Sequence, residues 1–77
     1  MFPFLLDGEL VGRVDIKADR AAGVLRVQSA WAEEGVDRGR VASELAGELR
    51  HMAEWLGLEA VLVVQKGDLA AELIAAV

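Results

Sequence analysis

Two sets of side chains in this sequence have types and spacings that could do chemistry: a lone histidine among carboxylates, and a series of cations at alternating positions. His51 lies in the stretch ELRHMAEW, with Glu48 three residues before it and Glu54 three residues after it. A metal site needs further ligands close by, and one imidazole with two helical carboxylates is a weak set. We therefore expect a partly exposed helix histidine, with no metal ion and no cofactor.

Nucleophilic and acid–base catalysis are poorly supported. Ser29 and Ser43 are the serines, neither lies in a G-x-S-x-G turn, and only one histidine is present to act as a base. The carboxylates are scattered along the chain, whereas acid–base work needs a desolvated carboxylate or a close pair. The sequence predicts no catalytic residue in this chain.

The cations are the stronger candidates for a working surface. Arg13 and Lys17 alternate with apolar residues over 9–18, Arg26 occupies a similar position in 24–32, and Arg20 lies in the loop between these segments. Asp15 lies among these cations and offsets part of their charge. Such a row could still contact the phosphates of duplex DNA. The pattern predicts no aromatic residue on this face, so base stacking is not expected. A solvated sheet face explains the same pattern, because antiparallel sheets commonly expose one polar side.

These candidates must be positioned by a short series of strands and helices. Alternation predicts strands, a stripe of period 3.6 predicts a helix, and Asp7-Gly8 between apolar runs predicts a tight hairpin. The expected segments are strands at 2–6, 9–18, 24–32 and 59–65, with helices at about 38–56 and 69–77. The fold class is therefore α+β, in the order β-β-β-α-β-α. We expect a mixed four-stranded sheet, with an antiparallel meander and both helices packed on one face.

The alternation also predicts which side chains face the helices. In strands 9–18 and 24–32 the expected inward residues are Leu10, Val14, Ile16, Leu25, Val27, Ser29 and Trp31. Ala30 then falls on the outer side with Arg26, and Val11 with Arg13. Gly12 marks a bulge or a close approach of the backbone.

Helix ends and the last strand are predicted from local chemistry. Asp37 and Asp68 are expected N-caps, and Gly57 is expected to end the long helix in a left-handed conformation. Pro3 places the first strand at a sheet edge. The segment 59–65 is nearly all apolar, which predicts a strand buried on both faces.

Length and composition limit the possible functions. The 77 residues predict a single domain, 1–77, and 55% of them are hydrophobic. No apolar run approaches the ~20 residues that cross a bilayer, so no membrane partner is expected. The absence of cysteine fits a cytoplasmic protein. The net charge of −5 argues against a generally basic, DNA-coating surface, and the apolar fraction suggests a surface covered by a second copy or by a larger protein.

Longer stretches of the chain are similar to a known family. The segment FLLDGELVGRVDIKADRAAGVLRVQSAWAEEG, followed by ELAGELRHMAEWLGLEAV, resembles the C-terminal part of the bacterial winged-helix DNA glycosylases, which remove alkylated bases and unhook interstrand crosslinks. The resemblance is carried by Gly12-Arg13, Asp15, Lys17, Asp19-Arg20 and 55–58.

The resemblance implies an accessory role. In that family the winged helices precede this segment, and the catalytic motif, of the type Gln-x-Gln or Gln-x-Asp, lies outside it. Gln28 is followed here by Ser-Ala and Gln65 by Lys-Gly, so neither matches. The chain is then expected to be a non-catalytic domain that braces the winged-helix part and offers Arg13, Lys17, Arg20 and Arg26 to DNA phosphates.

Two alternatives stay open. The order of elements is also that of the middle of an acyltransferase fold, where acyl-CoA would bind at the start of the helix, although Val36 stands where that fold's loop carries Arg or Gln. A helix start flanked by Arg38 and Arg40 could bind an anion. The high apolar fraction equally suits a self-associating interaction module.

Overall fold

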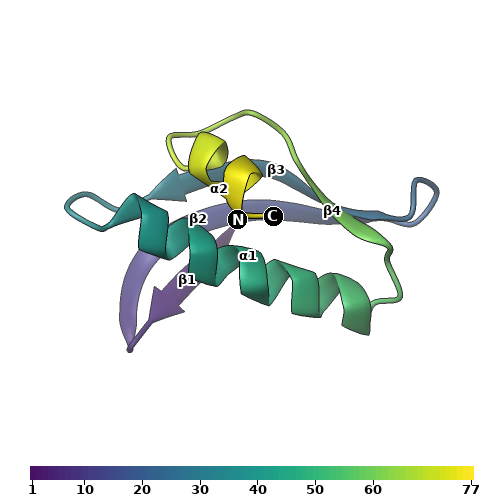
Figure 1. The fold of residues 1–77 in the computed structure, drawn as a ribbon, viewed down its shortest axis with the longest axis horizontal. Helices are drawn as coiled ribbons and strands as arrows, with labels where there is room; N and C mark the ends of the chain where they lie inside the picture. The colour runs from purple at the N-terminus through teal and green to yellow at the C-terminus, as the bar shows by residue number, and fades with distance from the viewer.

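The computed structural model describes all of residues 1–77 and has the predicted order of elements (Figure 1). The elements are β1 (Phe2–Leu6), β2 (Glu9–Asp19), β3 (Val24–Ala32), α1 (Arg38–Trp55), β4 (Ala60–Val63) and α2 (Ala70–Ala76). One sheet has the order β1-β2-β3-β4, and β4 runs parallel to β3 while the other neighbours are antiparallel. Both helices lie on one face of this sheet. The predicted mixed α+β fold is confirmed.

Asp7 and Gly8 form the predicted hairpin turn between β1 and β2. Their φ angles are 53° and 80°, the positive values that a type I′ turn requires at both central positions. Because β1 has no partner on its other side, Pro3 lies in an edge strand, as expected.

A bulge in β2 changes the predicted facing of two residues. Phe4 pairs with Gly12, but the next pair is Leu5 with Leu10, so Val11 is an extra residue in β2. Val11 is therefore buried and Leu10 is 38% exposed, the reverse of the prediction. Gly12 lies at this irregularity, and a Cβ there would be 2.9 Å from the carbonyl oxygen of Trp31.

A second bulge, in β3, has a larger effect on the candidate site. Asp15 pairs with Ser29 while Ile16 pairs with Val27, which leaves Gln28 as the extra residue. Beyond Gln28 the alternation is reversed. Ala30 is fully buried beneath the helices and Trp31 is 39% exposed on the other face, so the prediction of an inward Trp31 was wrong.

The core lies between the sheet and α1. Val14, Leu25 and Val27 from the sheet meet the predicted stripe of α1, of which Val41, Leu45 and Leu49 are buried. Leu69 and Leu73 close the core from the C-terminal segment.

Both ends of α1 are formed as the sequence indicated. The Asp37 side chain accepts a hydrogen bond from the Arg40 amide at 3.2 Å. At the other end Gly57 has a φ of 73°, its amide donates to the Glu54 carbonyl, and the Leu58 amide donates to the Ala53 carbonyl. This pair of hydrogen bonds is a Schellman motif, with Leu58 buried against the core.

The C-terminal third differs from the prediction in two respects. The strand β4 is shorter than 59–65 and forms a sheet edge, so Leu62 is 42% exposed and the strand is not buried on both faces. Asp68 does not cap α2. Instead its carboxylate accepts the Ala32 amide at 2.7 Å, beyond the point where β4 ends and can no longer pair with β3.

Gly67 fits closely against β3, because a Cβ at this position would overlap the Ala30 carbonyl oxygen. Lys66 and Leu69 on either side bond to the Ala30 backbone, at 3.0 and 3.1 Å. No helix in the structure has both the length and the apolar character needed to cross a membrane.

Candidate nucleic-acid interface

The face of the sheet opposite the helices, here called the open face, carries most of the predicted cations. Arg13 is paired in register with Trp31, and Lys17 with Arg26. Paired residues on neighbouring antiparallel strands project to the same side. Arg13 and Lys17 are both exposed and lie four positions apart in β2, so the open face holds three of the four predicted cations together with Trp31. Asp15 lies between Arg13 and Lys17 on the same face.

Lys17 and Arg26 form a cationic pair that one carboxylate partly neutralises. Arg26 makes an ion pair with Asp19 at 2.9 Å, and its side chain is about one-third exposed. The hydrogen bond from Arg26, together with one from the Ala22 amide, holds the pKa of the Asp19 carboxyl below its usual value. Lys17 has no ion pair in the structure.

Arg13 and Trp31 form the other half of the open face. Arg13 lies 3.6 Å from a Glu33 carboxylate oxygen, and its side chain is 54% exposed. A long, exposed contact of this kind adds little stability, so the guanidinium remains accessible to other anions. The expectation of a face without aromatics was wrong, since the β3 bulge turns Trp31 outward beside Arg13.

Arg20 is separated from the other three cations. Its guanidinium donates to the Leu56 carbonyl at 3.1 Å, at the C-terminal end of α1. A cation at this position satisfies a free helix carbonyl and interacts favourably with the helix dipole. The structure thus places Arg20 at the helix end, on the side of the sheet that α1 covers.

The start of α1 already has its anionic partners. Arg38 pairs with Asp68 at 3.5 Å and Arg40 pairs with Asp7 at 3.1 Å. The Asp37 carboxylate also occupies the end of the helix. The three carboxylates at the start of α1 disfavour the binding of a further anion there, such as the pyrophosphate of acyl-CoA.

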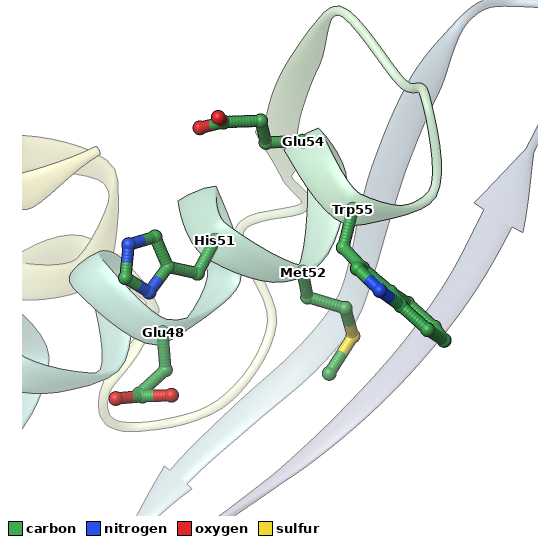
Figure 2. Close-up of a pocket in the computed structure, with 5 residues that line it drawn as sticks. All are labelled: Glu48, His51, Met52, Glu54 and Trp55. Carbon is green, nitrogen blue, oxygen red and sulfur yellow. The ribbon is translucent and has the colours of Figure 1, made fainter.

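The histidine region is a shallow surface rather than a site. Figure 2 shows the His51 imidazole and the Trp55 indole pointing in opposite directions from α1, with the side chains of Glu48 and Glu54 diverging. His51 is exposed, as predicted. No group of three or more His, Cys, Asp or Glu side chains in the structure is arranged to hold a metal ion.

A second surface feature is an apolar groove between β1 and α1. It has a volume of about 450 Å³ and is lined mainly by side chains from β1, β2 and α1, including Phe2, Phe4, Val14, Leu49 and Met52. Near one end Trp55 is 85% exposed. Neither tryptophan is therefore part of the core.

The chain is thus a small α+β domain with three cations and one exposed aromatic residue on an uncovered sheet face. Residues 1–55 match the model of a protein family described as DNA glycosylase AlkZ-like. The chain therefore belongs to the AlkZ-like DNA glycosylase family, which relates it to DNA repair. The match spans β1 to α1, and β4 and α2 lie outside it. No solved structure matches the chain.

Proposed function

We propose that this chain is a non-catalytic accessory domain of a winged-helix DNA-repair glycosylase, and that its open face contacts the phosphates of DNA. The observation that carries the proposal is the placement of Arg13, Lys17 and Arg26 on one uncovered sheet face in a member of a DNA glycosylase family. Because Arg20 is engaged at the end of α1, we assign DNA contact to the other three cations.

The non-catalytic part of the proposal is supported by the character of the surface. The hollow around His51 is shallow and its side chains diverge. The only side-chain polar atom that is buried without a hydrogen bond is a Glu72 carboxylate oxygen, which lies on α2, away from the open face. The catalytic groups of the repair reaction are then supplied by other parts of the glycosylase.

The test is a salt titration of DNA binding. Three phosphate contacts predict that log K falls with log salt at a slope of about −3 for duplex DNA. The double variant Arg13→Ala/Lys17→Ala should lower affinity at low salt and reduce the slope by about 2. Absence of measurable binding at low salt, measured by fluorescence anisotropy, would refute direct DNA contact.

A matched control changes charge on the same face in the opposite sense. Asp19→Asn removes the carboxylate that now holds Arg26, and should therefore raise DNA affinity. Arg50→Ala is the control for the loss of a positive charge elsewhere on the surface. Arg50 lies on the helix side, where its guanidinium donates to the Ala76 carbonyl. An equal loss for Arg50→Ala and the open-face variant would indicate a general charge effect instead of a local interface.

The same proposal assigns a bracing role to the apolar groove. Exposed Phe2, Met52 and Trp55 near or within the groove suit packing against another domain of the glycosylase. The competing function, a self-associating module, would use the same groove. Light scattering separates them: the accessory role predicts a monomer, whereas a dimer that Met52→Arg dissociates would favour self-association.

An acyl-CoA-binding fragment is not favoured. The family match points to DNA repair, and the start of α1 is surrounded by carboxylates. Calorimetry with acetyl-CoA should give no heat of binding.

A further inference from the structure

The open face contains a residue that phosphate binding does not need. Trp31 is 39% exposed on a sheet face that no helix covers, directly across from Arg13. A tryptophan contributes most to stability when it is buried, so this position gains only part of that benefit. The side chain faces outward only because Gln28 is an extra residue in β3.

We propose that Trp31 is a stacking platform for an unpaired DNA base, with Arg13 and Lys17 holding the flanking phosphates. This inference rests on the proposed function and deepens it, since it names single-stranded or unpaired DNA as the form that the open face prefers. Aromatic side chains on which bases stack, within a positively charged groove or face, are the usual means of binding single strands without reading sequence.

The geometry fits a short stretch of strand. Arg13 lies across from Trp31, so its guanidinium can reach a phosphate next to a base stacked on the indole. Lys17 is four residues further along β2, a distance of about 13 Å for an extended strand. Trp31, Arg13 and Lys17 together can therefore bind only a few nucleotides.

The indole stays accessible because its neighbours on the open face leave room for a base. Ser29, two positions away on the same side of β3, has a small and buried side chain, and Glu33 holds Arg13 only through a contact of 3.6 Å. A phosphate that replaces Glu33 would gain a charge-assisted hydrogen bond from Arg13, while the displaced carboxylate returns to water.

Intrinsic fluorescence gives a direct test, because Trp55→Phe leaves Trp31 as the sole tryptophan. Two probes are titrated into this variant: a thymidine oligomer of roughly 12 nucleotides, and an abasic backbone of equal length. Stacking predicts that the thymidine oligomer quenches Trp31 emission, and that it binds about 5- to 100-fold more tightly than the abasic strand.

The companion variant removes the platform. Trp31→Ala, in the otherwise unaltered chain, should bind the thymidine oligomer no better than the abasic strand, with affinity for the abasic strand unchanged. Circular dichroism shows whether this variant is folded. If it is not, the quenching of Trp31 in the Trp55→Phe chain still decides the question.

The failures of the two proposals can be told apart. Equal binding of thymidine and abasic strands, with unaltered Trp31 emission, would overturn the stacking platform. If that equal binding still falls in the Arg13→Ala/Lys17→Ala variant, phosphate contact stands alone. If neither probe nor duplex DNA binds at low salt, both proposals fail, and an outward Trp31 would then serve protein packing.

Discussion

Asp19 is the residue whose ionisation the fold changes most clearly. It accepts hydrogen bonds from the Arg26 guanidinium and from the Ala22 amide, and these hold its pKa below the usual value. A carboxyl with a lowered pKa in the folded state stabilises the protein above its unfolded pKa. That contribution is lost as the pH falls through the lower, folded value.

The stability that Asp19→Asn loses relative to the parent chain should therefore depend on pH. The variant should be less stable than the parent chain at pH 7, because its amide cannot replace the ionic partner of Arg26. The difference should shrink as the pH falls below about 3.9, the usual value for aspartate. Thermal melts at several pH values measure it, and a difference that grows on acidification would contradict the assigned ion pair.

Gly67 is the residue with the least room for change. Its φ of 102° disfavours any side chain, and a Cβ would overlap the Ala30 carbonyl. Gly67→Ala should therefore lower the free energy of unfolding by more than about 2 kcal/mol. Gly35→Ala is the matched control, because Gly35 has a φ of 79° but nothing within 4 Å. Equal losses in the two variants, measured by urea denaturation, would rule out the close contact.

At the level of elements, a glycine inside α1 and the glycine just after its C-terminal end have opposite expected effects. Gly57 has a φ of 73° in the Schellman motif, so Gly57→Ala should cost about 1 kcal/mol. Gly47 lies inside the helix, where alanine is favoured by about 0.5–1 kcal/mol. Each kcal/mol shifts Tm by about 4–8 °C in a domain of this size. A fall in Tm for Gly47→Ala would contradict this account.

The sequence predicted the elements well and the facing of the strands less well. The limits of the first three strands, the Asp7-Gly8 turn, the Asp37 cap and the Gly57 stop all depend on residues within a few positions of one another. A bulge depends on the partner strand, which a single strand's alternation does not contain. Gly12 did indicate the irregularity in β2, although not its effect on the facing of Leu10 and Val11, whereas the bulge at Gln28 escaped prediction.

The prediction of the candidate site was affected in the same way, because it also depended on the alternation of single strands. Arg13, Lys17 and Arg26 were correctly grouped, because Arg13 and Lys17 lie on one unbroken stretch of β2 and Arg26 lies before the β3 bulge. Trp31 lies after that bulge, so its outward position was missed. The role of Asp68 was also missed, since its partner, the Ala32 amide, is 36 residues away.

At the scale of the whole molecule, the charge of the chain opposes the interaction that we propose. The net charge is −5, so the protein as a whole repels DNA, and the proposed contact depends on the local cations of the open face. Affinity of the isolated chain should accordingly be weak. Such a contact becomes effective when it is held beside another DNA-binding unit, because tethering raises its effective concentration to the millimolar range.

The proposed function requires that DNA binds the open face and not the helix side. Amide chemical-shift mapping by NMR, on addition of single-stranded DNA at low salt, locates the contact. We expect the largest shifts at Arg13, Lys17, Arg26 and Trp31, with α1 and α2 little changed. Shifts concentrated on the helices, or no shifts at all, would rule out the open face as the DNA-binding surface.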